Sequence, residues 1–324
     1  MRLNRRHALA AILSSAASST AFAQQAAFPS KPIRLLVPWA AGTPADLAAR
    51  SVADLMGAEL GQAVYVENKN GAAGTVAVPE VLRYPADGHT LYMLASASLV
   101  APVLYPKSDI DFVRQFDAVG QVEWSYNIVC VSPDKPYRSV KELVDQIRNN
   151  PGRISYASGG NGTPPHLAGE MLNMQAGLKT NHVPYVQMGQ AATDVMTGLV
   201  DFIVMGAAGA LPQVKAGRLR ALAVTSAKRM ESLPDVPTMV ESGFPEFVIR
   251  PFDGLLVRKG APAQVVEKLN AALNVALDKP TVRERLATIG MEPVHSTPAA
   301  FARMVEEESA RWIGLARRAN LQIY

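Results

Sequence analysis

The sequence holds one cysteine in 324 residues, Cys130, which excludes an internal disulfide and a cysteine-based metal cluster. Cys130 lies in the apolar run Asn127–Val131, so we expect a buried thiol in a strand. Long apolar runs are also missing, because the stretch at residues 8–17 is too short to span a bilayer. A disulfide-stabilised scaffold and a retained membrane anchor are therefore both disfavoured.

The first 23 residues nevertheless have the features of an export signal. Arg2, Arg5 and Arg6 precede the apolar stretch, and residues 21–23 fit the small-x-small pattern of a cleavage site that ends at Ala23. The arginine pair fits a twin-arginine signal loosely, and an ordinary secretory leader fits equally well. These arginines account for all but one of the four net positive charges, so no basic tract remains that would indicate nucleic-acid binding. Residence in a bacterial periplasm is the prediction.

Common catalytic motifs are absent from the sequence. It has no Gly-x-Ser-x-Gly elbow, no His-Glu-x-x-His pair and no Gly-Lys-Ser/Thr phosphate loop. Acidic residues are dispersed, and His166 alone among the histidines lies beside the turn described next. At such a position a packed or solvent-facing histidine is the more common outcome, and a ligand contact is the alternative. We predict a binding protein without catalytic residues, cofactor or metal.

One glycine-rich turn connects a predicted strand to a predicted helix. Ile154–Ala157 is short and apolar, and beyond the turn at residues 158–163 apolar side chains recur at helical spacing. Thr163 occupies the expected N-cap, and two prolines follow it, as the first turn of a helix tolerates. Free N–H groups and the dipole at such a helix N-terminus attract anions.

A second copy of this pattern lies 120 positions earlier. The strand Ile33–Val37 leads into Gly42-Thr43-Pro44, which matches Gly162-Thr163-Pro164, and Leu-Ala follows both at the same spacing. Glycine and proline are common in any strand-to-helix loop, so a purely structural pair of turns is the alternative. Because two matched turns occur in one chain, we interpret them as belonging to two lobes that hold an anion between helix N-termini.

Strand and helix patterns alternate along the chain, which predicts an α/β fold with mostly parallel sheets covered by helices. Ligands of such sheets bind beyond the carboxyl ends of the strands. Three loops follow those ends in the N-terminal part, at residues 39–43, 71–75 and 96–98, and we expect them to form one rim of the site.

The motifs of the chain resemble those of the substrate-binding proteins of tripartite tricarboxylate transporters, the Bug family. The matching stretches follow one another through almost the whole mature sequence, which makes the resemblance specific. They are Pro32–Gly42, Val64–Asn68, Gly71–Gly74, Pro85–Leu91, Ile154–Thr163, His166–Glu170, His182–Tyr185, Lys215–Thr225 and Leu233–Thr238.

The resemblance implies a two-lobed periplasmic binding protein of the type II-like class, in which each lobe is a mostly parallel sheet flanked by helices. It implies that lobe 2, residues 127–250, is inserted into lobe 1, residues 28–126 plus 251–324. Family ligands are small carboxylates, held by backbone amides and waters from the loops at 39–43 and 158–163, and delivered to integral-membrane permease subunits. We expect a monomer that binds no nucleic acid.

The candidate ligand contacts come from these loops and from strand ends on both lobes. They are Trp39, Ala41, Gly42, Thr43, Ser96, Ser98, Ser158, Gly159, Gly160, Gly162, Thr163, His166, Gln187 and Met205.

Departures from the family pattern leave the ligand open. The family usually has phenylalanine at Trp39, a second glycine at Thr43, Lys-Gly at residues 186–187, and Phe-Asp where this chain has Val204-Met205. A thioether cannot pair with an ammonium as that aspartate does, so a carboxylate without an amino group is predicted. Two alternatives to a transport receptor stay open: an exported enzyme acting on a small carboxylate, and a sensor that presents its ligand to a membrane kinase.

Overall fold

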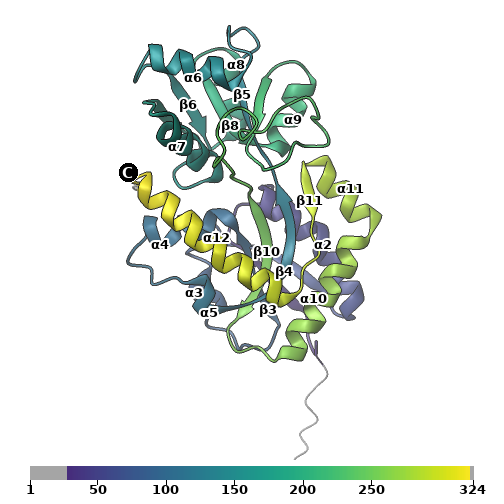
Figure 1. Ribbon diagram of the computed structural model, residues 1–324. Coiled ribbons are helices and arrows are strands. Elements are labelled where there is room, and N and C mark those ends of the chain that lie inside the picture. Colours follow the sequence, from purple (N-terminus) through teal and green to yellow (C-terminus); the bar gives the residue numbers. More distant parts are fainter. Residues whose placement is uncertain (1–27, 322–324) are drawn as a thin grey trace, which may run out of the picture.

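Two lobes, each built on one β-sheet, make up the computed structural model, which describes residues 28–321 (Figure 1). The predicted export signal, with its cleavage site after Ala23, lies outside the described residues. None of the helices in the described part has both the length and the apolar character needed to cross a lipid bilayer.

Lobe 1, the lower lobe in Figure 1, contains a six-stranded sheet. Its strands are β1 (Ile33–Val37), β2 (Val64–Asn68), β3 (Thr90–Ala95), β4 (Phe116–Ser125), β10 (Phe252–Arg258) and β11 (Met291–Pro293). They lie in the order β11-β4-β10-β3-β1-β2. The strand β1 is parallel to β2 and β3, whereas β10 is antiparallel to β3 and β4, and β11 is antiparallel to β4.

Lobe 2 contains a five-stranded sheet in the order β7-β6-β8-β5-β9. Its strands are β5 (Asn127–Val131), β6 (Ser155–Ser158), β7 (Asn181–Pro184), β8 (Phe202–Gly206) and β9 (Arg220–Val224). The strand β6 is parallel to β7 and β8, whereas β5 is antiparallel to β8 and β9. The two-lobed α/β architecture agrees with the prediction, but both sheets are mixed rather than mostly parallel. The reason is that β4, β5 and β10, which adjoin the crossings between the lobes, run against their neighbours.

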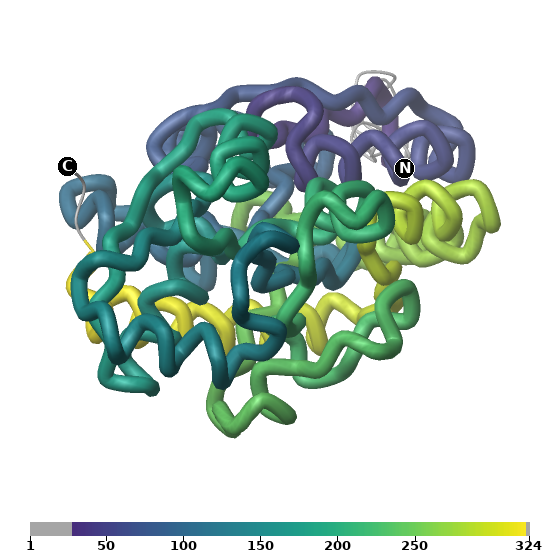
Figure 2. Tube along the Cα trace, turned by 90° about the horizontal axis from the view of Figure 1, so that it is seen from above, coloured from purple at the N-terminus to yellow at the C-terminus, as the bar shows by residue number. Residues whose placement is uncertain are grey.

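Helices cover the faces of both sheets. They are α2 (Pro44–Leu60), η2 (Ala72–Gly74), α3 (Val78–Val81), η3 (Ser96–Val100), α4 (Ala101–Leu104), α5 (Phe112–Gln115), α6 (Val140–Asn149), α7 (Pro164–Ala176), α8 (Met188–Met196), α9 (Ala207–Lys215), α10 (Ala263–Asp278), α11 (Pro280–Thr288) and α12 (Pro298–Arg318). Of the three C-terminal helices, α10 and α11 pack on α2. The third, α12, packs on β4 and η3 and reaches α7 of lobe 2, and seen from above it passes beneath the teal segments of that lobe (Figure 2).

Two chain segments cross between the lobes side by side. The strand β4 continues into β5 with only Tyr126 between them, and the returning chain enters β10 after Pro251. The Ser125 N–H donates to the Pro251 carbonyl at 2.9 Å, and Phe252 pairs with Trp124 in the sheet of lobe 1. Because the two crossings are hydrogen-bonded to each other, they form one connection at the base of the space between the lobes.

The apolar core continues through this connection. One cluster of buried side chains includes Leu36 and Phe301 of lobe 1 together with Tyr156 and Val204 of lobe 2. Each lobe has a second cluster on the other face of its sheet. Cys130 belongs to the second cluster of lobe 2 and is fully buried, as predicted, and burial raises the pKa of its thiol to about 12.

Candidate functional site

A cavity of about 450 Å³ lies between the lobes and is lined by both of them. From lobe 1 come the turn before α2, the loop at η2 and the carboxyl end of β3. From lobe 2 come the turn before α7, the start of α8 and the junction of β8 with α9. The crossing segments at residues 125–127 and 251–253 also line it. We call this cavity the cleft.

The lobe 1 turn is held by a network around Asp46, which is 2% exposed. The Gly42 N–H donates to Asp46 Oδ2 at 2.9 Å, and Arg50 Nε and Asn68 Nδ2 donate to Oδ1 at 3.0 and 2.7 Å. The same Asn68 nitrogen donates to the Trp39 carbonyl at 3.0 Å. Burial opposes ionisation of Asp46, but these hydrogen bonds outweigh it, so its pKa lies below the ordinary value.

The lobe 2 turn has the same form with a histidine in place of the aspartate. The Gly162 N–H donates to His166 Nδ1 at 3.1 Å, four residues ahead as in lobe 1. The backbone angles match, because φ is +80° at Gly42 and +77° at Gly162. Positive φ at both sites favours glycine. Thr43 and Thr163 also share one geometry: each hydroxyl donates to the carbonyl three residues earlier at 2.7 Å. Thr163 is the N-cap residue as predicted, but its side chain caps no helix N–H.

Stacked rings support the lobe 2 turn from behind. The centroid of the His166 ring lies 4.0 Å from that of His182, and the centroid of the Tyr156 ring lies 4.9 Å from that of His182 and 6.4 Å from that of His166. His182 Nε2 lies 2.6 Å from Ser158 Oγ, which in turn accepts the Gly160 N–H at 3.1 Å. Burial, together with the neighbouring His182, lowers the pKa of His166 to about 3, and burial lowers that of His182 to about 4. Both imidazoles are therefore neutral supports of the turn.

Five of the predicted contacts line the cleft: Trp39, Thr43, Ser96, Gly159 and Thr163. Others lie in the same turns without lining it, namely Ala41, Gly42, Gly160 and Gly162. Ser98, Ser158 and His166 are buried behind the lining, and Gln187 is an exposed N-cap residue between two lining residues, Val186 and Met188. The structure thus brings the turns of both lobes to one cavity, while several predicted side chains support it from outside.

The prediction that Met205 faces the ligand is wrong. Met205 was expected at the carboxyl end of its strand, facing the ligand, but β8 extends one residue further, and Gly206 and Ala207 line the cleft instead. Met205 is 3% exposed and packs in the second core cluster of lobe 2. Because its thioether lies in the core, it carries no information about an amino group on the ligand.

The sequence reasoning missed two polar residues of the cleft, Asn127 and Asp253, both on the crossing segments. Asn127 is 2% exposed, and its Nδ2 has no hydrogen-bond partner within residues 28–321; the same holds for Trp39 Nε1. A buried donor without a partner is costly, so both are candidate ligand contacts. One signal was available for Asn127 and Asp253: each is a polar residue near the start of a largely apolar strand.

Asp253 is the one carboxylate among the residues that line the cleft, and Lys, Arg and His contribute no side chain to that lining. It is 5% exposed and lies opposite Glu123, which is fully buried, in the pairing of β10 with β4. Burial raises the pKa of Asp253 to about 7, although the neighbouring Glu123 carboxyl group opposes the shift. Burial, and then the charge of Asp253, raise the pKa of Glu123 well above its ordinary value.

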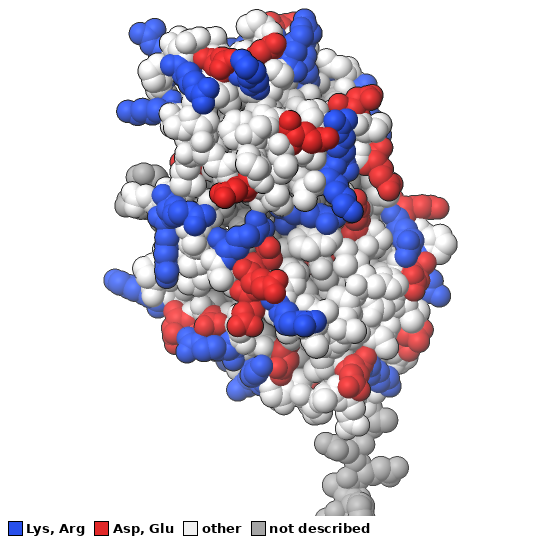
Figure 3. Space-filling view, in the orientation of Figure 1, with Lys and Arg blue, Asp and Glu red and all other residues white. Residues whose placement is uncertain are grey.

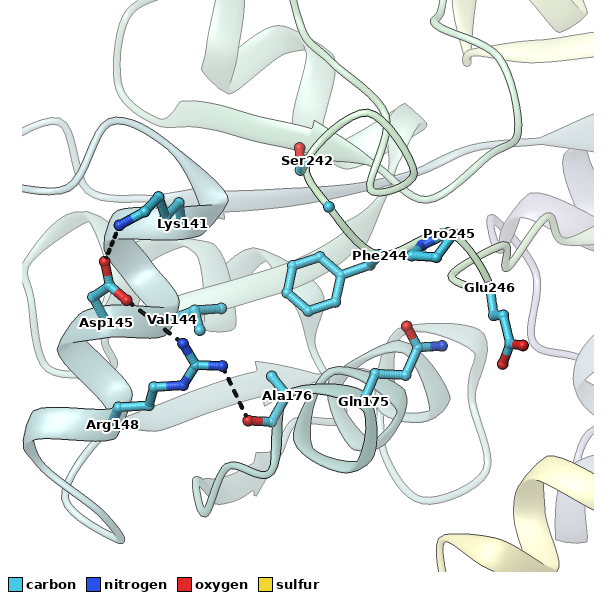
Figure 4. Close-up of a pocket in the computed structure, with 11 residues that line it drawn as sticks. Lys141, Val144, Asp145, Arg148, Gln175, Ala176, Ser242, Phe244, Pro245 and Glu246 are labelled. Carbon is cyan, nitrogen blue, oxygen red and sulfur yellow. Dashed lines mark hydrogen bonds and ion pairs between the residues drawn. The ribbon is translucent and has the colours of Figure 1, made fainter.

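A second hollow lies on lobe 2 between α6, the end of α7 and residues 242–246 (Figure 4). Three of its charged groups pair with one another: Lys141 Nζ and Arg148 Nη1 lie 2.6 and 3.7 Å from the Asp145 carboxylate. On the face shown in Figure 3, side chains of both signs are interspersed over both lobes. Within residues 28–321, no three His, Cys, Asp or Glu side chains are grouped so that they could hold a metal ion. The cleft is therefore the candidate site.

Comparisons with known proteins point to one family. The profile described as "Tripartite tricarboxylate transporter family receptor" matches residues 47–321. A relative from Pseudomonas sp. strain P51, described as a UPF0065 protein in the tcbD-tcbE intergenic region, is 35% identical over 96% of this chain and 93% of its own.

Solved structures agree with that result. The periplasmic binding protein BugD has a TM-score of 0.79 at 33% identity, over 91% of this chain and all of its own. MatC from Rhodopseudomonas palustris, with bound malate, has a TM-score of 0.78 at 30% identity, over 89% and 99%. R. palustris Rpa4515, with adipate, has a TM-score of 0.81 at 28% identity, over 91% and 100%.

Proposed function

The chain belongs to the tripartite tricarboxylate transporter family of receptors, and from this premise we propose that it is a solute-binding receptor that captures a small carboxylate in the cleft between its lobes. One observation carries the proposal: two turns of matched geometry, one from each lobe, contribute Thr43 and Thr163 to the same cavity. Each turn ends at the N-terminus of a helix, where free N–H groups and the helix dipole favour an anion.

The polar groups of the cleft suit a carboxylate in a second way. Trp39 Nε1 and Asn127 Nδ2 are donors without a partner in the described chain, and a ligand oxygen would satisfy them. The rest of the lining is largely apolar, with Met188, Ile289, Met291 and the ring of Trp39, which suits the carbon body of the ligand. Malate and adipate, found in two relatives, both combine carboxylates with a short carbon chain.

The biological setting follows from the family. Solved relatives include a periplasmic binding protein, and we propose that this chain also works in the periplasm, after removal of its leader behind Ala23. We propose that it acts as a monomer and delivers its ligand to the integral-membrane permease subunits of a tripartite transporter. Mass spectrometry of the exported protein tests the leader, and a mature product that starts at Gln24 is expected.

The family is one of receptors, so we propose binding without turnover. The test is to incubate the protein with a bound carboxylate and to analyse the solution by mass spectrometry. Recovery of the unchanged ligand is expected. Conversion that depends on the intact cleft would instead establish the exported enzyme considered from the sequence.

Ligand binding is tested by calorimetry with malate and adipate, preceded by a thermal-shift panel of mono-, di- and tricarboxylates. A ligand at 100 times its Kd should stabilise the protein by about 2.7 kcal/mol, which such a panel detects. Asn127→Ala should weaken binding by about tenfold or more, because a hydrogen bond to a charged group is lost.

The matched control is Asn181→Ala on β7, where the amide donates to the Gly152 carbonyl away from the cleft. That variant should bind as the unmodified protein does. If no carboxylate in the panel shifts the melting temperature, the receptor function proposed here is wrong.

A further inference from the structure

Two buried carboxyl groups meet at the base of the cleft. Asp253 on β10 lies directly opposite Glu123 on β4, and the charge of an ionised Asp253 acts on the Glu123 carboxyl group. Neither carboxyl oxygen of Glu123 has a hydrogen-bond partner within residues 28–321. Two buried carboxyl groups that face each other strongly disfavour being ionised together, so we expect at least one of them to carry a proton.

Within residues 28–321, the elements around the two carboxyl groups supply one cation that acts on them. Arg250, which precedes β10, is the cation that acts on Glu123, but its guanidinium forms an ion pair with Glu292 on β11 and lies 4.8 Å over the ring of Trp124. Tyr126 also donates its hydroxyl to Glu292.

The remaining neighbours of Asp253 are uncharged. On β3 its partner is Ala95, followed by Ser96, whose hydroxyl accepts the Phe252 N–H at 3.3 Å. Phe301 of α12 packs under Gly254. Among the residues that the structure describes, no cation therefore balances the charge of an ionised Asp253.

Asp253 reaches the cleft, whereas Glu123 does not. An ionised Asp253 would repel a bound carboxylate at short range with little screening by water. A protonated Asp253 would remove that repulsion and offer an O–H donor to the carboxylate.

We propose that Asp253 is a specificity-determining residue that takes up one proton from solvent when a carboxylate binds, and then donates a hydrogen bond to it, with Glu123 as the positioning residue. Glu123 keeps its own proton and donates it to the second oxygen of Asp253. The proposal rests on the carboxylate-receptor function, and it makes ligand capture proton-linked.

The experiment is calorimetry with malate and with adipate between pH 6.5 and 8.5, where both free ligands stay ionised. Phosphate and Tris buffers, which differ in ionisation enthalpy, report the number of protons taken up. We expect uptake of close to one proton at pH 8.5, and a Kd that rises by up to about tenfold per pH unit above pH 7.

Variants separate the effect of protonation on ligand binding from the effect of side-chain shape. Asp253→Asn keeps a hydrogen-bond donor and cannot titrate, so its Kd should be independent of pH and should match the pH 6.5 value of the unmodified protein. Asp253→Leu removes the donor and should bind more weakly throughout this range. Glu123→Gln should shift the pH range over which the Kd changes, without making the Kd independent of pH.

The control is Asp117→Asn, on β4 but paired with Lys259 away from the cleft. It should leave the pH dependence of Kd unchanged. Thermal melts without ligand verify that each variant is folded. For Asp253→Asn the melting temperature should rise relative to the unmodified protein as the pH increases, because a buried ionised group has been removed.

The outcomes distinguish failure of this proposal from failure of the carboxylate-receptor function on which it rests. A Kd for malate and adipate that does not change with pH in the unmodified protein overturns the proton-linked role and leaves the receptor function standing. Tighter binding of amino acids than of their deaminated analogues, increasing above pH 7, would assign Asp253 to an ammonium and also overturn it. Absence of binding by every mono-, di- and tricarboxylate of the thermal-shift panel, malate and adipate included, contradicts the receptor function itself.

Discussion

The turns at residues 40–46 and 160–166 have one backbone geometry in two different environments. Gly42 has open space where a Cβ would lie, whereas a Cβ on Gly162 would approach Leu104 Cδ1 of lobe 1 to 2.5 Å. The glycine N–H is received by an ionised aspartate in lobe 1 and by a neutral histidine in lobe 2. The backbone shape is thus independent of the charge of the side chain that supports it, and each environment can be altered separately.

The largest expected effect comes from filling the space at the glycines. Gly162→Ala should cost about 2–5 kcal/mol in the free energy of unfolding, since left-handed backbone costs about 1–2 and overpacking Leu104 about 1–3. Gly42→Ala should cost only the backbone part, about 1–2 kcal/mol. Urea unfolding without ligand measures both. Equal losses of unfolding free energy in the two variants would show that Leu104 moves aside at no cost.

Acid should affect the lobe 2 turn first. His166 binds a proton near pH 6.5 when unfolded but only near pH 3 when folded, so its contribution to stability is present above pH 6.5 and is lost as the pH falls. The free energy of unfolding should fall by about 3 kcal/mol by pH 4 because of His166. Protonation of His182, which is also neutral in the folded protein, should lower it further. The pKa of Asp46 is also lowered, but from 3.8, so its contribution is lost only at more acidic pH.

The measurement compares unfolding free energies of the protein and its variants at pH 4 and 6.5. His166→Gln should reduce the difference between the two pH values, and Asp46→Asn should leave it almost unchanged. A pH difference that is the same in the unmodified protein and in His166→Gln would contradict the assignment of a neutral histidine to this turn.

The helix N-termini differ by one donor. The second helical position is Ala45 in α2, which has an N–H, and Pro165 in α7, which has none. Pro165→Ala should tighten carboxylate binding by up to about tenfold if the new N–H reaches the ligand, and Ala45→Pro should weaken it by a similar factor. Calorimetry with malate tests the exchange. Identical constants in all three proteins would mean that neither position faces the ligand.

The threonines should give the smallest and the most equal effects. Thr43→Ala and Thr163→Ala each remove one hydroxyl that donates to a carbonyl in the turn, so each should cost about 1 kcal/mol of stability. Thermal unfolding measures the cost, and calorimetry shows whether binding falls further. Weaker binding in only one of the two variants would show that the two threonines have different roles despite their matched geometry.

Local patterns predicted most of the fold. The strands at 33–37, 127–131 and 154–157 and the start of the helix after Thr163 agree with the structure to within about one residue, because apolar spacing and the residues at a helix start are local signals. Most of β4 and all of β11 were missed. They are formed by long-range pairing, and β11 is only three residues long, which is too short for a periodic signal.

The site was predictable where it depends on the backbone. Both Gly-Thr-Pro turns reach the cleft, but Met205 does not, because a shift of one residue along a strand moves a side chain to the other face. Asn127 and Asp253 were missed since their role depends on the crossing of two segments that are far apart in sequence. Motif spacing carries no information about such a meeting.

Because Cys130 is buried, fluorophores can be attached selectively to cysteines introduced at the surface. Thiol-directed dyes react with exposed thiolates, and this thiol is inaccessible and has a pKa near 12, so the unmodified chain should stay unlabelled. Val186 at the rim of lobe 2 and Val76 on lobe 1 are 97% and 46% exposed. Fluorophores attached through Val186→Cys and Val76→Cys would follow the separation of the lobes during ligand capture, with the native cysteine left in place.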